Sequence, residues 1–309
     1  LLLRDGRRYS LAPENEGPRL AEEEFTGLGY EPVLSPWYAD AAGISGRLVG
    51  TGRVASDAGC ELPTVDLGPL RGPLTEPEKA RFRWLGATTA SVVAGVLEAL
   101  EPGDSEYDME GVVARLLLSH GVLPSVLLMA VDERIVKYKH AVARGAALQR
   151  FGMLNLCARK WGLAVSMTRF VHFGAMPAEL ERGFAAATQV NAELWHATRN
   201  GVSAGELYRV AQRAYAAAGY AGEEQRHHQG GAAGYLERDW VATPEGTERV
   251  TAPQAFAWNA SCRGGKVEDT VLVSADGSVE VLTATPELPV VETMVGGTVY
   301  HASGVLMPG

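Results

Sequence analysis

The stretch RHHQGGAAGYLERD, from Arg226 to Asp239, brings together residue types that can perform chemistry. Its adjacent histidines could bind a metal ion or transfer protons, because an imidazole titrates near neutral pH. Its glycines could form a phosphate-binding loop or let the backbone pass close to a substrate. The stretch lacks the spacings G-x-x-x-x-G-K-[ST] and G-x-G-x-x-G, so we do not expect nucleotide binding.

The two histidines of this stretch, His227 and His228, are consecutive. Side chains of an extended segment alternate between opposite faces, so we expect only one of them to face a pocket and the other to bond backbone or solvent. A third histidine, His140 in KYKHAV, stands outside any metal-ligand spacing. It suits proton transfer at neutral pH, or it is a strand-end histidine that bonds a backbone carbonyl.

Charged residues of two apolar strands are further candidates. Glu268 and Asp269 are consecutive in KVEDTVLV, so one of them must point inward. An inward carboxylate acts in acid–base chemistry, anchors a cation, or is the buried partner of Arg169 or Arg238. Arg169 itself needs an internal partner or a bound anion, because a buried unpaired guanidinium is costly.

The composition limits the partners and the compartment. The 309 residues carry a net charge of −9 and a pI near 5.4 without clustered Lys or Arg, so we expect a small-molecule or short-peptide substrate, not nucleic acid or a membrane surface. No apolar run approaches the roughly 20 residues of a membrane helix. The chain begins at Leu1 without a charged-then-apolar leader, and we expect its true start to lie upstream. Three widely spaced cysteines, Cys60, Cys157 and Cys262, predict neither disulfides nor a zinc cluster and favour the reducing cytoplasm.

Two domains are predicted to carry these residues. Residues 1–72 are typical of a small mixed α/β piece, with extended segments in LLLRDGRRYSLAP and a Glu-rich helix over residues 15–27. Gly and Pro in DLGPLRGPLTEPE mark a boundary, and Thr75 with Glu78 forms a capping box that begins a helix. A second domain therefore spans residues 73–309.

The second domain contains an internal repeat. Gly103 matches Gly201 and Gly121 matches Gly219, both at an offset of 98 residues. Each half predicts a long helix, a glycine turn, a second helix and then strands. The strands include SVLLMAVDERI and two antiparallel hairpins, RFGMLNLC with WGLAVSMTRFVHFG and QAFAWNA with KVEDTVLV. The duplication predicts a pseudo-twofold α/β core with a site in the groove between the halves.

Four local features resemble the pita-bread fold family, which includes methionine aminopeptidase, aminopeptidase P, prolidase and creatinase. They are the histidine in KYKHAV, the Thr-Arg pair in VSMTRFV, the His/Gly-rich stretch and VEDTVLV. The resemblance covers about residues 75–290, and residues 1–72 resemble the tail of the N-terminal domain of creatinase and aminopeptidase P. It implies an α/β (α+β) pita-bread fold with an internal pseudo-twofold duplication, preceded by part of a small α/β N-terminal domain, in a homodimer.

The resemblance also implies where metal ligands would stand. Metallopeptidases of this family hold two divalent ions with two Asp, one His and two Glu, because adjacent cations need bridging carboxylates. Of these five metal ligands, this sequence keeps only one carboxylate and one imidazole, so we predict no metal and no other cofactor. His227 stays open as the alternative to His228 at the His position. The five positions are occupied by Asn155, Ser166, His228, Asn259 and Glu268.

Creatinase, a member that works without metal, implies roles for the other residues. His140 matches its general base, and Arg238 matches, within one residue, the arginine that holds its substrate's carboxylate. Thr168 and Asn259 replace the two glutamates that grip creatine's guanidinium, so creatine is not the expected substrate. The predicted catalytic residues are His140, His228 and Glu268, and the predicted substrate-binding residues are Arg238, His227, Asn259, Thr168, Arg169 and Tyr235.

The resulting hypothesis is a metal-independent hydrolase of the creatinase and Xaa-Pro peptidase family that acts on a C–N bond of a small carboxylated substrate. His140 moves the proton, Arg238 holds the carboxylate, and Glu268 with His228 orients the reacting group. Two alternatives stay open. One is a non-catalytic protein that binds a small molecule or peptide, and the other is a metal-dependent Xaa-Pro aminopeptidase or dipeptidase.

Overall fold

The computed structural model of the chain describes residues 1–39, 41–49, 53–57 and 62–308. The chain divides into two compact units, Leu1–Leu67 and Gly68–Gly309, so the boundary predicted between residues 72 and 73 lies inside the second unit. Cys60 lies outside the described residues. That residues 1–72 are the tail of a creatinase-like N-terminal domain stays a prediction.

The first unit has the mixed α/β content that the sequence predicts. Its elements are β1 (Leu2–Arg4), β2 (Arg7–Pro13), α1 (Gly17–Arg19), the π-helix η1 (Leu20–Glu24), β3 (Tyr30–Ser35) and α2 (Ala41–Val49). β2 pairs antiparallel with β1 and parallel with β3. Asp5 and Gly6 join β1 to β2 with positive φ angles of 49° and 77°, as a two-residue hairpin turn between twisted strands requires.

Two helix pairs of the second unit repeat each other. They are α4 (Glu76–Ala99) with α5 (Glu106–Ser119), and α7 (Ala178–Ala197) with α8 (Ala204–Ala217). Ser105 and Ser203 each begin the second helix of a pair, and their Oγ atoms accept hydrogen bonds from the backbone N–H groups of Asp108 and Glu206. These serines lie 98 residues apart, the offset found between the glycines. The capping geometry therefore supports the predicted duplication.

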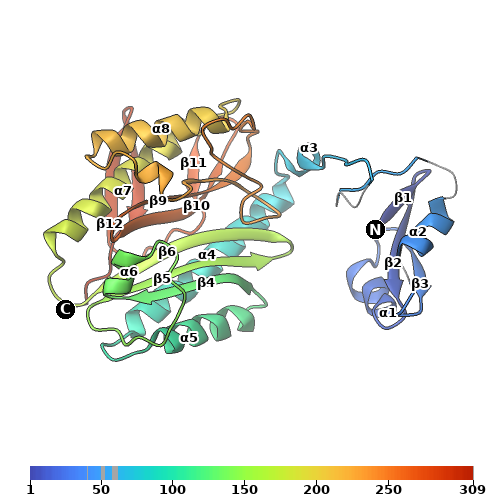
Figure 1. Cartoon of the computed structure of the whole chain (residues 1–309), viewed down its shortest axis with the longest axis horizontal. Helices are drawn as coiled ribbons and strands as arrows, with labels where there is room; N and C mark the ends of the chain where they lie inside the picture. Colours follow the sequence, from blue (N-terminus) through green and yellow to red (C-terminus); the bar gives the residue numbers. More distant parts are fainter. Residues whose placement is uncertain (40, 50–52, 58–61, 309) are drawn as a thin grey trace. The chain divides into compact units, whose positions relative to one another are not determined.

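One eight-stranded sheet joins the two halves (Figure 1). In sheet order its strands are β4 (Leu123–Val131), β5 (Phe151–Lys160), β6 (Leu163–His172), β10 (Gly265–Val273), β9 (Gln254–Cys262), β7 (Gly230–Ala233) and β8 (Trp240–Val241), with β11 (Val279–Val281) paired to β10. The structure forms both predicted hairpins, β5-β6 and β9-β10, and β6 and β10 meet at the centre. The strand predicted to reach Ile135 ends at Val131, because Asp132 has a φ of +50° and helix α6 (Glu133–Lys137) begins there.

Both helix pairs cover the same face of this sheet (Figure 1). α4 packs on β5 and β6, and α7 packs on β9 and β10. Leu154 and Leu156 of β5 are buried in the core with residues of α4, and Trp258 of β9 is buried in the core with residues of α7. Because strand side chains alternate, Asn155 and Asn259 point to the opposite face. That face carries the candidate site.

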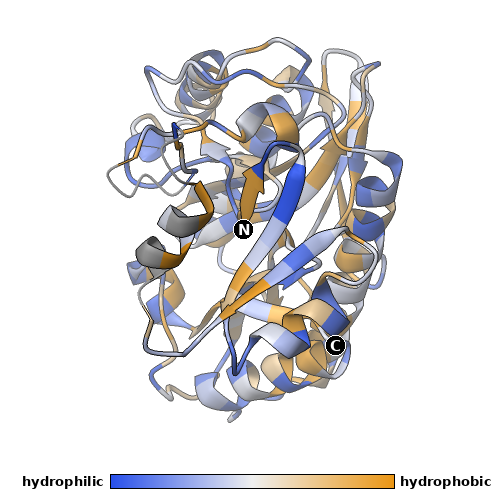
Figure 2. Ribbon diagram, turned by 90° about the vertical axis from the view of Figure 1, so that its right-hand side faces the viewer, coloured by the Kyte–Doolittle hydropathy of each residue, from blue (hydrophilic) through white to orange (hydrophobic). Residues whose placement is uncertain are grey.

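Hydrophilic and hydrophobic residues are mixed along the helices (Figure 2). Within the described ranges, no helix is both long enough and apolar enough to cross a membrane. Short elements complete the second unit, namely α3 (Gly68–Arg71), the 3-10 helix η2 (Glu223–Gln225) and a separate hairpin of β12 (Val290–Val295) and β13 (Thr298–Ser303).

Candidate active site

A row of polar side chains crosses the sheet on the face opposite the helices. Asn155 of β5 lies opposite Thr168 of β6, Thr168 lies opposite Glu268 of β10, and Glu268 lies opposite Asn259 of β9. Residues directly opposite each other on paired strands share a face, so the register alone aligns these side chains. All four are buried. We name this set the polar row.

Glu268 lies at the centre of the polar row, and both of its oxygens are engaged. Oε2 accepts hydrogen bonds from Asn155 Nδ2 and Thr168 Oγ1, both at 2.6 Å, and Lys266 Nζ lies 3.0 Å from the same oxygen. Oε1 accepts from Arg238 Nη2 at 3.1 Å. Burial alone would raise the pKa of Glu268, but Lys266, Arg238 and the bond from Thr168 lower it to about 2. The carboxylate therefore stays ionised at neutral pH.

Lys266 is a site residue that the sequence analysis did not single out. It precedes Glu268 by two residues on β10, so both side chains point to the same face, and it is only 7% exposed. Its partner across the sheet is Ser261 of β9. The sequence did contain a signal, because a lysine inside a buried strand needs an acidic partner and Glu268 is placed to supply one.

Ser166 and Arg238 extend the polar row on one side. Ser166 Oγ accepts a hydrogen bond from Arg238 Nη1 at 2.9 Å and lies 3.1 Å from Cys157 Sγ. Burial, with the nearby charge of Glu268, raises the pKa of Cys157 to about 11, so this thiol stays protonated at neutral pH. Arg238 also donates to the carbonyl oxygen of Glu237. The guanidinium predicted to hold a substrate carboxylate is thus already bonded to three protein groups.

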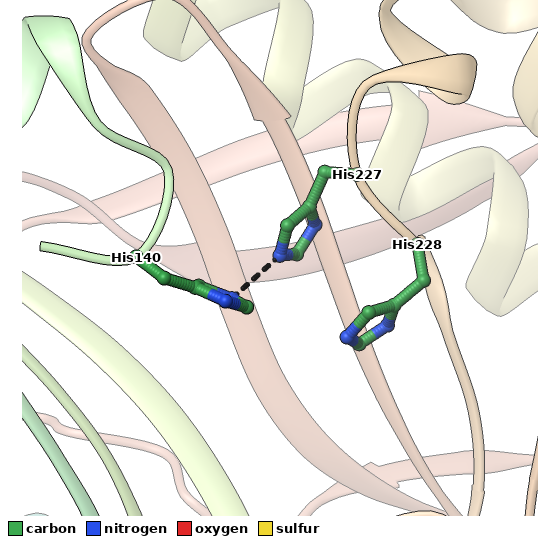
Figure 3. Close-up of side chains that lie close together, drawn as sticks. All are labelled: His140, His227 and His228. Atoms are coloured by element: carbon green, nitrogen blue, oxygen red, sulfur yellow. Dashed lines mark hydrogen bonds between the residues drawn. The ribbon is translucent and has the colours of Figure 1, made fainter.

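Three histidines from two segments of the chain lie beside one another in Figure 3. These are His140, His227 and His228, and one ring nitrogen of each lies within 4.8 Å of the others. His140 Nε2 and His227 Nε2 are hydrogen-bonded at 2.7 Å, and the rings of His227 and His228 stack with centroids 4.6 Å apart. The expectation that only one of the consecutive histidines joins the site is wrong, because both precede β7 and neither lies in a strand. We name this set the histidine cluster.

Hydrogen bonds from Lys139 link the two segments that carry the histidine cluster to each other and to β9. Lys139, the neighbour of His140, donates from Nζ to the carbonyl oxygen and Oγ of Ser261 at 3.0 and 3.2 Å, and to Glu223 Oε2 at 2.8 Å. Glu223 lies in η2, just before the consecutive histidines. Because Ser261 lies opposite Lys266 in the sheet, these bonds hold the histidine cluster at the Lys266 end of the polar row.

The surroundings of the histidine cluster favour neutral imidazoles. Partial burial lowers the pKa of all three histidines, although His140 and His228 keep exposed surface, and the positive charge of Lys266 lowers each of these pKa values further. The negative charge of Glu268 acts in the opposite direction on all three and is outweighed. A neutral imidazole keeps an unprotonated ring nitrogen, which a general base needs.

Arg169 lies apart from the polar row, in an ion pair on the helix side of the sheet. Its Nη2 donates to Asp269 Oδ1 at 2.5 Å, and both residues are buried. The other donors go to Thr285 Oγ1 and to the carbonyl oxygens of Thr168, Glu268 and Thr283. A guanidinium has five N–H groups, and five protein bonds occupy them. The structure thus gives the predicted substrate-binding role of Arg169 no free donor.

Tyr235 also lies outside the polar row. Its hydroxyl donates to Glu78 Oε1 at 2.6 Å, and Glu78 is the residue that completes the capping box of α4. Asn259, in contrast, is part of the row, and its buried Oδ1 accepts no hydrogen bond from the described part of the chain. Of the predicted substrate-binding residues, the structure therefore brings together Thr168, Asn259, Arg238 and His227.

The polar row does not fit a pair of divalent ions. Three of the five ligand positions, Asn155, Ser166 and Asn259, carry neutral side chains, and neighbouring donors engage both oxygens of Glu268. Two adjacent dications need several carboxylates to offset their mutual repulsion. The imidazoles of the histidine cluster are ligands for a single transition-metal ion, but the positive charge of Lys266 opposes a cation there.

The second unit has the pita-bread fold, as solved structures show. The dipeptidase PepE from Mycobacterium ulcerans matches with a TM-score of 0.75 and 18% identity over 97% of this chain and 84% of that one. The prolidase from Pyrococcus furiosus matches with a TM-score of 0.74 and 19% identity over 91% of this chain and 89% of that one. The model of Metallopeptidase family M24 matches residues 80–275, and the chain belongs to this family. The predicted fold and family are confirmed, and the family supports a hydrolase.

The same fold also occurs outside proteins named as peptidases. The N-terminal domain of the FACT complex subunit SPT16 from Cicer arietinum matches with a TM-score of 0.66 and 13% identity over 90% of this chain and 81% of that one. No curated protein matches the chain. The finer function must therefore be argued from the side chains of the site.

Proposed function

We propose that the chain is a metal-independent hydrolase that cleaves a C–N bond of a small carboxylated substrate, with His140 as the proton-transfer group. The observation that carries this proposal is the hydrogen bond between His140 Nε2 and His227 Nε2 at 2.7 Å. In the tautomer that lets His140 act as a base, His140 Nε2–H donates to His227 Nε2 and the free unprotonated nitrogen of His140 is Nδ1. A proton taken by His140 can then be shared with His227.

The proposed reaction needs a base, a way to return the proton and stabilisation of negative charge. His140 takes a proton from water as the water oxygen attacks the carbon of the C–N bond, and the proton then passes to the leaving nitrogen. Glu268 stays ionised and holds Lys266 and Arg238 in place. Their positive charges stabilise the negative charge that develops on the substrate.

A pair of histidine substitutions tests the assignment of the base. General acid–base catalysis contributes about 10²–10⁴-fold, so His140→Ala should lower kcat/KM by about that factor. His120→Ala is the matched control, because His120 is an exposed histidine at the end of α5. The panel of substrates includes dipeptides with a C-terminal proline, since structural neighbours are named prolidase and Xaa-Pro dipeptidase. Unchanged turnover by His140→Ala would show that another group is the base.

A second candidate is a protein that binds the same class of ligand without cleaving it. The neutral side chains of Asn155, Ser166 and Asn259 favour this candidate, because they stand where the resemblance places the carboxylates of the family's catalytic metal site. A ligand-dependent rise in Tm without product formation, across the same panel, would support it. Cleavage of a proline peptide that Mn²⁺ stimulates and a chelator abolishes would instead support a metal-dependent peptidase.

A further inference from the structure

Glu268 of the polar row lies between two cations, Lys266 and Arg238. Lys266 Nζ lies 3.0 Å from Glu268 Oε2, and Arg238 Nη2 lies 3.1 Å from Glu268 Oε1. Lys266, which is buried, and Arg238, which is partly buried, thus share one carboxylate. Buried charges are stable only when they are balanced by opposite charge and hydrogen bonds. Glu268 alone does not balance both.

The surrounding charges leave one cation in excess. Glu237, next to Arg238 in the chain, faces the positive charges of both Arg159 and Arg238. Three cations, Lys266, Arg238 and Arg159, therefore face two acids, Glu268 and Glu237. Lys139 and Arg169 do not change this balance, because each has its own acidic partner. Lys139 pairs with Glu223, and Arg169 pairs with Asp269. Among the described charged groups around Glu268, one cation is therefore without an acid of its own.

We propose that Lys266 is the resident cation of this site: its ammonium takes the place on Glu268 that a divalent cation would need, and it binds the carboxylate of the substrate beside the histidine cluster. The identity of that carboxylate rests on the proposed function. An ammonium has three donors and Glu268 uses one. Arg238 has five N–H groups, of which three are bonded to Ser166, Glu237 and Glu268, and its buried Nε has no partner among the described residues. We give the carboxylate-binding role predicted for Arg238 to Lys266 because Lys266 lies opposite Ser261, at the end of the polar row that carries the histidine cluster.

The same lysine explains why metal chemistry does not fit. An ammonium at hydrogen-bond distance from Glu268 Oε2 repels a dication that approaches the same oxygen. Without that ammonium, the three imidazoles of the histidine cluster would offer three ring nitrogens to one ion. That is a ligand set which Zn²⁺ accepts. Removal of the lysine charge should therefore create affinity for Zn²⁺.

Calorimetric titration with Zn²⁺ alone tests the cation half of the proposal. Lys266→Met removes the charge and keeps the length of the side chain, and Lys160→Met is the control, because Lys160 bonds the carbonyl oxygen of His120 away from the site. We expect Lys266→Met to bind one Zn²⁺ at least about tenfold more tightly than the wild type, since the change removes a repulsion between like charges. The control should match the wild type. Equal Zn²⁺ affinity of wild type and Lys266→Met would overturn the proposal.

A pair of ligands that differ by one charge tests the anion half. Affinities for Gly-Pro and for its neutral carboxamide are measured in the His140→Ala background, where turnover does not interfere. With Lys266 present the acid should bind about tenfold more tightly or better, as a charge-assisted hydrogen bond supplies. Lys266→Met should lose this preference and Lys266→Arg should keep it. Equal affinity for acid and carboxamide with Lys266 present would overturn the proposal.

The two tests separate this proposal from the proposed function. Both measure binding, so a chain that hydrolyses nothing can still prefer the acid and exclude Zn²⁺. Lys266→Met should also fold, because Glu268 keeps its bonds from Asn155, Thr168 and Arg238. If it does not fold, the comparison of acid with carboxamide in the presence of Lys266, and the Lys266→Arg variant, still decide the outcome.

Discussion

Arg169→Met should destabilise the second unit strongly and leave ligand affinity unchanged. Arg169 is 2% exposed and makes five bonds, the shortest of them to Asp269 Oδ1 at 2.5 Å. Methionine fills much of the same space but offers no donor. Asp269, which is fully buried, would then keep only the hydrogen bond from Thr283 Oγ1. Burial raises the pKa of Asp269 and Arg169 opposes that rise, so without Arg169 the carboxyl group has lost the charge that offsets its burial.

The magnitude follows from the cost of an unpaired buried charge. Removal of one partner of a buried ion pair costs about 3–5 kcal/mol. For a unit of this size, about 2–4 °C of Tm is lost per kcal/mol, so Tm should fall by roughly 10 °C. A residue that only bound substrate would show the opposite pattern, with a raised KM and an unchanged Tm.

Urea denaturation followed by circular dichroism measures the change. The double variant Arg169→Met/Asp269→Asn is the informative control, because it also removes the stranded charge. It should be more stable than Arg169→Met by at least about 1 kcal/mol, as expected for two residues in direct contact. The reasoning is refuted if Arg169→Met lies within about 1 kcal/mol of the wild type, or if the double variant regains nothing.

Three further outcomes are expected. Purified protein should contain less than about one equivalent of transition metal, and chelators should change neither Tm nor activity, because a ligand that does not bind the native state cannot stabilise it; elemental analysis that finds two tightly held ions per chain would contradict this. The acid limb of the pH profile of kcat/KM should have its midpoint below pH 6.5, because burial and the charge of Lys266 lower the pKa of His140. The neutral ring of His140 is the active form. A midpoint above pH 7 would exclude His140 as the base. Iodoacetamide at pH 8 should leave Cys157 and Cys262 of the folded protein unmodified, because burial raises their pKa values to about 11 and about 12; rapid alkylation seen by mass spectrometry would show exposed thiolates.

The local features of the fold were predictable from the sequence. Gly103 and Gly201 mark equivalent turns because glycine adopts positive φ without strain, and both have φ angles above 80°. The alternation in RFGMLNLC and KVEDTVLV fixes which side chains share a face, since the period of a strand is two. Alternation therefore showed that Glu268 and Asp269 lie on opposite faces, but the pairing of the strands decided that Glu268 shares a face with Asn155.

The partners of the charged side chains were decided by the tertiary structure. Glu268 meets Asn155, and Arg169 meets Asp269, across about 100 residues of chain, and only the pairing of β6 with β10 brings them together. The side chains of His227 and His228 lie side by side because both residues precede β7, which begins at Gly230. The alternation of a strand could not predict where that strand begins. A sequence shows which residues can carry charge. Which cation neutralises which acid depends on distances of a few ångströms that the folded chain alone sets, because Coulomb energy falls with separation and with solvent exposure.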